Sequence, residues 1–544
     1  MHRTDISSTD TNVSGAYNRT PQEGLRERSG ISILMVLLLV LGTVTPPLMA
    51  QDEASAPPTT PVSKSPAETD QKAAELARMI AEKLDLIPDP RTLKREDLPA
   101  IFLILDDGID AGRRFIREYP DSELLPKVCI DLSRLLILNV DRHIGLLAQD
   151  SKESGAPMTA TQRFEEQTFY LSEVIQLART ALSGNLPPSQ ICRAEVALGD
   201  ALLKSRVPAE AAKAFGRALL LDLSAVDENE LRIREVEALE LAGDYPAMLK
   251  SGLGILESHS ETAFLPHVVY FTHKACRHLG KLSTGRDIWR TWGPVLDAGK
   301  TAGAEIRLPG VEQTFTVPEG KENDFAMMAD RAGFYEGFYQ LALGEKEAAL
   351  QALLAFNDSI YERINSGDTL SMPTKTYFEF QSIPMSQRID VLHGKKAPSL
   401  DGVTWIQDNP LSADSKLELR IFCDSSRGNN RQSRFLDIVK KLEAEFSSQG
   451  LSVVWISGVL REERGPVESA AMMKIAQSKN LGWKIGVQAG QDKGVLDRHL
   501  VSHGGTILFL LDAEKKIRWE VIDPMFWDEG LYRTIIRRLL ASGS

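Results

Sequence analysis

A chain of 544 residues, 43% of them hydrophobic, is long enough for two or three domains with cores of their own. Its net charge of −12 argues against nucleic acid or an anionic membrane surface as the main partner, because both attract cationic surfaces. The charge is uneven. Residues 394–544 contain 22 Lys and Arg and 19 Asp and Glu, so their net charge is +3. Residues 51–393 have a net charge of −15.

The first fifty residues have the features of an export signal. Two arginines precede an apolar run of about 14 residues from Ile31. Two prolines and then Leu48-Met49-Ala50 close this run, like the small-residue end of a secretory signal. A membrane-spanning helix needs about 20 apolar residues. We therefore expect residues 1–50 to be a cleaved signal or, alternatively, an uncleaved anchor. Both interpretations place the folded protein in the periplasm or cell envelope, with membrane contact only through residues 31–50 if these are kept.

Helices are predicted through the middle of the chain. Residues 51–70 are rich in Pro, Ser, Thr and Ala and have almost no large apolar side chains, which predicts a disordered linker. From Gln71 apolar residues recur three and four positions apart, as on one face of a helix. Turn-forming segments such as YPDS at 119–122 separate these runs. We expect a helical domain over residues 71–393.

Parts of this domain look repetitive. Residues 194–222 and 334–358 each read as a helix, a short break and a second helix, and the segment that Gly280 interrupts does the same. These segments resemble tetratricopeptide-type helical hairpins of the divergent kind found in bacterial envelope proteins. The resemblance covers about residues 190–360 and implies stacked hairpins with a concave, acidic surface suited to a basic or polar protein segment. A plain helical bundle is the alternative. At residues 301–324, short alternating runs predict a small β-hairpin.

From Gly394 the pattern changes to alternating strands and helices. A strand, a helix and another apolar strand imply a parallel crossover, and two strands joined by four turn residues imply a terminal hairpin. The sequence therefore predicts a mixed sheet with helices on both faces. The expected strands are 417–422, 451–457, 483–489, 506–512 and 516–522.

The region opens with GKKAPSLDGVTWIQD at 394–408, a Gly…Ala-Pro segment with a short strand, and it contains the hairpin TILFLLDAEKKIRW near its end. In both segments it resembles the extracytoplasmic thioredoxin-like proteins, the thiol-disulfide oxidoreductase and peroxiredoxin-related (redoxin) superfamily. The resemblance covers roughly residues 394–544. It implies a multidomain fold, in which an all-α helical-repeat domain is followed by an α/β thioredoxin-like domain.

The family's redox site is missing from this sequence. It needs two cysteines separated by two residues at the first turn of a helix, where the helix N-terminus favours the thiolate, and a cis-proline opposite them. Aligning Phe422 with the aromatic residue before that motif puts Arg427 and Asn430 at the cysteine positions. Thr506, or Gly505 with a one-residue slip, takes the position of the proline. We therefore expect no dithiol chemistry and no cofactor.

Two weaker interpretations concern the same turn. Cys423 is the alternative catalytic residue, as a lone thiol, although its place at the end of a buried strand favours simple packing. The second is an anion site, because backbone N–H groups at a helix start bind anions and arginines strengthen such a site. Ordinary solvated arginines are the alternative to it. The arginines concerned are Arg427, Arg431 and Arg434.

The four cysteines match no metal-ligand spacing, and no HExxH, GxSxG or P-loop motif is present, so no metal is predicted. They allow three disulfide pairings, or they are buried free thiols. They are Cys129, Cys192, Cys276 and Cys423. Taken together, the residues predict an exported, non-catalytic interaction or scaffold protein with a protein or peptide partner in the cell envelope. A thioredoxin- or peroxiredoxin-like oxidoreductase that uses Cys423 is the alternative.

Overall fold

The described residues form two compact units that meet in the sequence between Arg206 and Val207. No helix among them is both long and apolar enough to cross a bilayer. The predicted export signal at 1–50 lies outside them, and so do residues 51–65 of the predicted linker, but residues 66–70 of that linker are helical, which corrects its end. The computed structural model describes residues 66–88, 97–153, 156–221, 223–224, 226–258, 262–310, 314–367, 370, 372–409, 411, 415–423, 429–459, 465–489, 494–500, 506–522 and 528–542.

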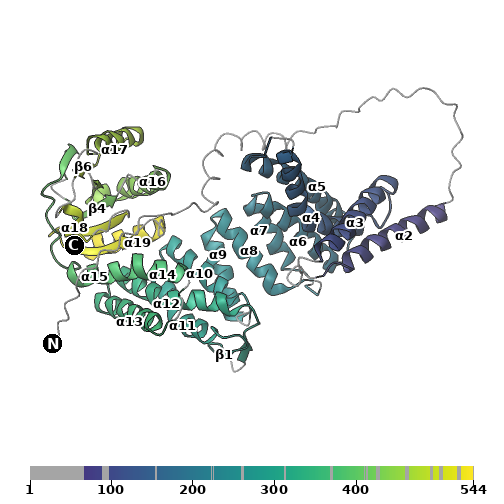
Figure 1. Ribbon diagram of the computed structural model, residues 1–544, viewed down its shortest axis with the longest axis horizontal. Coiled ribbons are helices and arrows are strands. Elements are labelled where there is room, and N and C mark those ends of the chain that lie inside the picture. The colour runs from purple at the N-terminus through teal and green to yellow at the C-terminus, as the bar shows by residue number, and fades with distance from the viewer. Residues whose placement is uncertain are drawn as a thin grey trace. The chain divides into compact units, whose positions relative to one another are not determined.

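The first unit is helical, and each helix packs against the next in the chain (Figure 1). Apolar residues at helical spacing supply its core, in which Phe115, Leu132 and Leu171 are fully buried. Thr159 caps one helix start through a capping box with Gln162. The helices are α2 (Pro66–Asp85), α3 (Leu98–Glu118), α4 (Leu125–Glu153), α5 (Ala160–Leu182) and α6 (Pro188–Lys204).

The second unit begins with a succession of helices that also pack in chain order. Three of them end at glycines in the left-handed conformation, which glycine adopts without the steric cost of a Cβ: Gly243 (φ 73°), Gly280 (φ 66°) and Gly344 (φ 88°). The helices are α7 (Pro208–Ala218), α8 (Glu228–Ala242), α9 (Tyr245–Ser258), α10 (Leu265–Leu279), α11 (Leu282–Ala298), α12 (Glu322–Leu343), α13 (Lys346–Asn365), α14 (Met372–Tyr377), the π-helix η2 (Phe378–Ser382) and α15 (Ile383–Val391).

The predicted hairpin between these helices is present. Strands β1 (Glu305–Arg307) and β2 (Thr314–Thr316) pair antiparallel, and Ile306 lies opposite Phe315. Ile306 is buried and its two neighbours on β1 are exposed, which is the alternation that the sequence pattern indicates.

A six-stranded mixed sheet follows, in the order β3-β6-β5-β4-β7-β8. β4, β5 and β6 are parallel, whereas β3, β7 and β8 each run antiparallel to their neighbours. The predicted parallel crossover and terminal hairpin are therefore confirmed, and the sheet is compatible with a thioredoxin-like domain. The strands are β3 (Thr404–Gln407), β4 (Leu417–Cys423), β5 (Leu451–Val459), β6 (Lys484–Ala489), β7 (Ile507–Asp512) and β8 (Ile517–Ile522).

Three helices cover one face of this sheet. The crossovers from β4 to β5 and from β5 to β6 move in the same direction, so right-handed connections put α16 (Asn429–Phe446) and α17 (Gly465–Lys479) on the same side (Figure 1). The terminal helix α19 (Glu529–Ser542) joins them, since Lys441 on α16 lies 3.4 Å from Glu529. The other face carries the short helix α18 (Val495–Arg498) and residues of α15.

A buried ion pair connects the helical part of the second unit to its sheet. Nε of Arg388, on α15, lies 3.3 Å from a carboxylate oxygen of Glu520 on β8, and both side chains are fully buried. Nη1 of Arg388 donates to the backbone oxygen of Leu500 at 3.0 Å. Burial raises the pKa of Glu520 to about 7, and Arg388 only partly opposes this. The pair therefore ties two segments together at a considerable desolvation cost.

A second contact brings two backbones together. Gly280, at the end of α10, lies against the first turn of α19, so a Cβ on Gly530 would collide with the carbonyl oxygen of His278. Beside this contact Asp528 is held by Arg277 at 3.0 Å and by His278 at 2.9 Å. Burial would raise the pKa of Asp528, but these two partners hold it below its usual value. Within the second unit, the helices are thus packed directly against the sheet and its terminal helix.

Candidate functional site: the central strand of the sheet

The structure describes only part of the predicted site. Arg427 lies outside the described residues, and so do the side chains of Asn430, Arg431 and Arg434, whose backbones belong to α16. The anion site therefore stays a prediction. Cys423 and Thr506 are described, and they occupy the ends of neighbouring strands.

Cys423 is the last residue of β4 and is 4% exposed. Nε1 of Trp455, on β5, donates to its Sγ at 2.9 Å, and Sγ lies 3.8 Å from the backbone oxygen of Ile456. Ser457, paired with Cys423 in register, donates its proton to Glu468 at 2.5 Å, and its Oγ lies 3.3 Å from the Cys423 backbone oxygen. The thiol is thus packed and hydrogen-bonded inside the sheet.

Thr506 lies half-buried directly before β7. Ile507, the next residue, pairs with Phe422 of β4 in antiparallel register, so Thr506 falls beside Cys423 at one edge of the sheet. The strand register thus makes Thr506 a neighbour of Cys423, whereas the side chains at the start of α16 lie outside the described residues. The structure brings together two of the predicted positions, and neither is a second thiol.

All four cysteines are buried and free. Burial raises the pKa of Cys129 to about 11 and that of Cys276 to about 12. Thiols of this kind are poor nucleophiles at neutral pH, because the thiolate is the reactive form.

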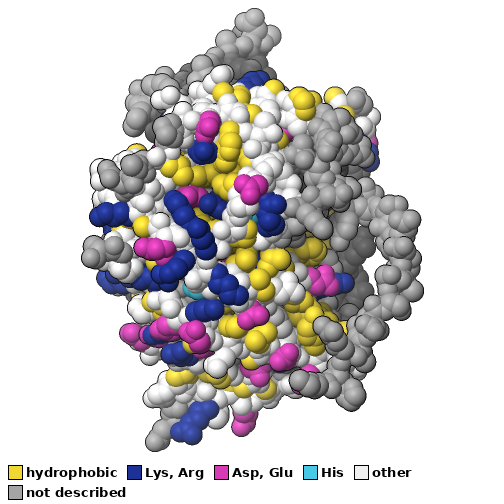
Figure 2. Space-filling model, turned by 90° about the vertical axis from the view of Figure 1, so that its left-hand side faces the viewer, with side chains coloured by type: hydrophobic (Ala, Val, Ile, Leu, Met, Phe, Trp, Pro, Cys, Tyr) yellow, Lys and Arg dark blue, Asp and Glu magenta, His cyan; other side chains and the backbone are white. Residues whose placement is uncertain are grey.

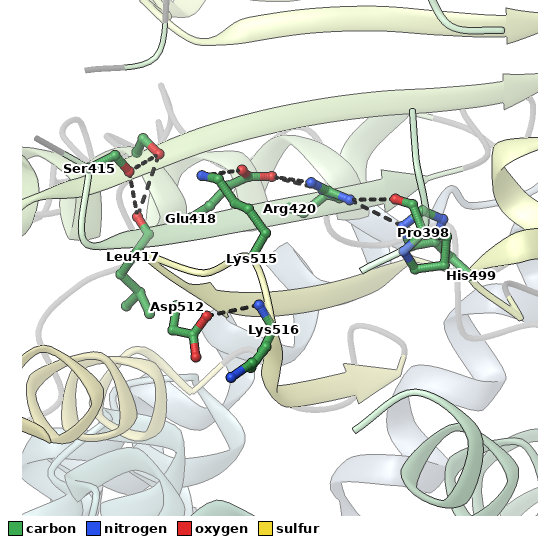
Figure 3. Close-up of polar contacts among 10 residues, drawn as sticks. Pro398, Ser415, Leu417, Glu418, Arg420, His499, Asp512, Lys515 and Lys516 are labelled. Carbon is green, nitrogen blue, oxygen red and sulfur yellow. Dashed lines mark hydrogen bonds and ion pairs between the residues drawn. The ribbon is translucent and has the colours of Figure 1, made fainter. Parts of the chain in front are cut away.

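A polar network that the sequence did not single out lies on the opposite face of β4. Glu418 and Arg420 alternate with apolar residues and so share that face (Figure 3). Nε of Arg420 donates to Glu418 at 2.8 Å, and Lys515, in the β7–β8 turn, donates to the other carboxylate oxygen at 3.0 Å. Nη1 of Arg420 lies 3.2 Å from Nε2 of His499 and donates to the backbone oxygen of Pro398 at 3.4 Å.

The contacts of His499 define its protonation. Since Arg420 can only donate, Nε2 of His499 is an acceptor, and Nδ1 then carries the proton and donates to the backbone oxygen of Val495 at 2.7 Å. Burial, together with the charge of Arg420, lowers the pKa of His499 to about 3. Burial alone would raise the pKa of Glu418, but Arg420 and Lys515 hold it below its usual value. The network is internally satisfied, which fits a structural role rather than proton transfer.

We expect His499 to make the second unit sensitive to acid. A histidine whose pKa is lower in the folded state than in the unfolded state contributes its full stabilisation of the fold only above the unfolded pKa of 6.5. This contribution is lost as the pH falls from 6.5 toward about 3, the pKa of His499 in the folded protein. For His499 the loss between pH 7 and pH 5 is about 2 kcal/mol. Urea unfolding followed by tryptophan fluorescence measures it, because all seven tryptophans lie beyond residue 206.

The matched variant is His499→Gln. Its free energy of unfolding should fall about 2 kcal/mol less than that of the parent between these pH values. Comparing how the free energy of unfolding changes with pH in the two proteins cancels the contributions of the other titrating groups. These include Glu520, whose raised pKa makes the fold more stable as the pH falls. Equal slopes would contradict the burial of a neutral imidazole.

The exposed surface near the sheet has mixed charge. Figure 2 shows the face at the left of Figure 1, where Lys and Arg side chains gather beside hydrophobic ones and Asp and Glu lie between and below them. Among the described residues, no group of three or more His, Cys, Asp or Glu side chains could hold a metal ion.

No family model and no curated protein matches the chain. Among solved structures, it is similar to a domain of a possible thiol-disulfide isomerase from Cytophaga hutchinsonii. The identity is 18%, the TM-score is 0.21, and the match covers 28% of this chain and 96% of that one. A likeness of that size decides nothing about chemistry, which depends on the residues of this chain.

Proposed function

We propose that the protein is exported and acts in the cell envelope by binding other proteins, without redox catalysis. In this proposal the helices are tetratricopeptide-like hairpins that supply an acidic binding surface. The α/β domain is a thioredoxin-like domain that has kept its scaffold and lost its thiol chemistry.

The observation that carries the proposal is the state of Cys423. An oxidoreductase of this class needs a thiolate that a substrate disulfide or peroxide can reach. Cys423 instead lies within the sheet, 4% exposed, with Trp455 donating to its Sγ. The buried ionic network on the other face of β4 shows that this strand is built into the core on both sides.

We expect iodoacetamide to label Cys423 in the native protein at least about 100-fold more slowly than in urea, because reaction requires opening of the sheet. Mass spectrometry of the Cys423 peptide at several pH values measures this. Insulin-reduction and peroxide assays should show no turnover above that of a Cys423→Ser control. Fast native labelling near pH 6 with turnover would instead establish the lone-thiol oxidoreductase.

A partner assay tests the binding half of the proposal. Full-length protein and its Cys423→Ser variant should capture the same partner from an envelope extract, and the same band should appear on reducing and non-reducing gels. A partner that is linked through a mixed disulfide and lost in the variant would overturn the proposal.

A further inference from the structure

We propose that a pocket between α3, α4 and α5 of the first unit binds an Arg or Lys side chain of a protein partner. The inference rests on the proposed function, since it names the chemistry by which a partner is recognised. The pocket has a volume of about 530 Å³. Binding sites in proteins typically have about 300–1,000 Å³, so a long side chain and part of its backbone fit.

Two carboxylates in this pocket are available to a cation. Asp110 on α3 and Glu166 on α5 both line it and are exposed. Neither carboxylate makes a hydrogen bond or ion pair with any residue that the structure describes. The charge of Asp110 also acts on Arg113, but the guanidinium of Arg113 makes its hydrogen bonds with Glu173.

The other charges in the pocket are already neutralised. Arg113 donates twice to Glu173, at 3.0 Å and 2.7 Å, and this pairing raises its pKa. Asp106 is held in the same way by Arg142, at 2.6 Å and 2.8 Å. These bidentate pairs leave Asp110 and Glu166 as the net charge that a ligand meets, so the pocket favours a cation.

Aromatic rings supply the second half of the site. The ring of His143 stacks on Tyr170, with centroids 4.4 Å apart, and Tyr170 is fixed by a hydrogen bond from Asn139 at 3.2 Å. Burial, reinforced by Arg113, lowers the pKa of His143, and the charge of Glu166 only partly opposes this. Phe169 lines the same pocket and is 76% exposed, so much of its ring is open to a ligand.

Carboxylates beside aromatic faces suit a guanidinium or ammonium group on an aliphatic stem. The rings attract the cation and pack against the stem, while the carboxylates accept its N–H groups. An anionic ligand would instead face two uncompensated negative charges. The wider sequence agrees with this polarity, because residues 51–393 carry −15.

The test uses three fluorophore-labelled pentapeptides with Arg, Lys or citrulline at the centre and alanine elsewhere. Citrulline keeps the shape of arginine and removes its charge. With the full-length protein, fluorescence anisotropy should give a Kd for the Arg and Lys peptides at least about tenfold below that for the citrulline peptide. The difference should shrink between about 50 and about 500 mM salt, as screening requires.

The variant Asp110→Asn/Glu166→Gln should weaken binding of the Arg peptide at least about tenfold and leave that of the citrulline peptide unchanged. The matched control is Asp150→Asn/Glu165→Gln, which removes two exposed carboxylates from α4 and α5 that do not line the pocket. It should bind as the parent does, within about twofold.

Equal affinity for the Arg and citrulline peptides would overturn the inference, as would equal loss in the two double variants. Such a result leaves the proposed function standing if the Cys423→Ser protein still captures its partner. A reactive Cys423 with turnover would overturn the proposed function whatever the peptides do. The two failures are therefore distinguishable.

Discussion

Replacing Arg388 by methionine is expected to lower the free energy of unfolding of the second unit by about 3–5 kcal/mol, because it leaves Glu520 as an unpaired acid in the core. Both side chains are fully buried, and one oxygen of Glu520 already makes no hydrogen bond within the described part of the chain. The loss should appear in urea unfolding followed by tryptophan fluorescence at pH 7.

The pH dependence of this loss identifies its cause. Glu520 without Arg388 would hold its proton to still higher pH, since the charge that favours its ionisation is gone. The deficit of Arg388→Met should therefore be largest at alkaline pH, shrink as the pH falls toward about 7, the pKa of Glu520 in the parent, and level off below it. A deficit that is constant with pH would point to lost packing instead.

The control is the double variant Arg388→Met/Glu520→Leu. Replacing both members of a buried pair by apolar residues is often neutral or stabilising, so this protein should recover most of the loss. If the double variant is as unstable as Arg388→Met alone, then the hydrogen bond from Arg388 to Leu500 contributes more than the ion pair.

The second large effect is expected for Gly530→Ala. The new methyl group would collide with the backbone oxygen of His278, and backbone cannot move aside as a flexible side chain can. Either α19 shifts away from α10 or the new contact is strained. Overpacking of this kind costs about 1–3 kcal/mol and sometimes more, and we expect the upper end because Asp528, with its buried ion pairs, lies only two residues away.

Gly254→Ala is the matched control. Gly254 lies within α9 of the same unit, and a Cβ there meets no atom within 4 Å. Alanine should stabilise the helix by about 0.5–1 kcal/mol. Thermal unfolding followed by tryptophan fluorescence should therefore shift down for Gly530→Ala and slightly up for Gly254→Ala. Similar shifts in both variants would show that α10 and α19 do not approach as described.

Local patterns in the sequence were sufficient for the sheet and for the position of Cys423. Alternation and short turns predict the strands, and the strand-like run that ends at Cys423 predicts its place at the end of a buried strand. The charged network was not anticipated. Its signal is present in the segment LELRIF, where Glu418 and Arg420 share one face of an otherwise apolar strand.

Contacts between distant segments could not be predicted in this way. Arg388 and Glu520 are 132 residues apart, and no local pattern around an arginine on a helix indicates which distant residue it pairs with. The division between Arg206 and Val207 falls inside the helical hairpin pattern of 194–222, because that pattern describes local periodicity and not which helices pack together. The pocket likewise combines residues from three helices, each of them unremarkable alone.

The close approach of Gly280 to Gly530 also constrains how this protein can change during evolution. The backbone oxygen of Gly530 lies 2.6 Å from where a Cβ on Gly280 would stand, so a side chain at either position requires a shift of the opposing segment. Substitutions in these two stretches are therefore coupled, although 250 residues separate them in the chain. The helices of the second unit and its sheet region therefore cannot accept side chains at this contact independently of each other.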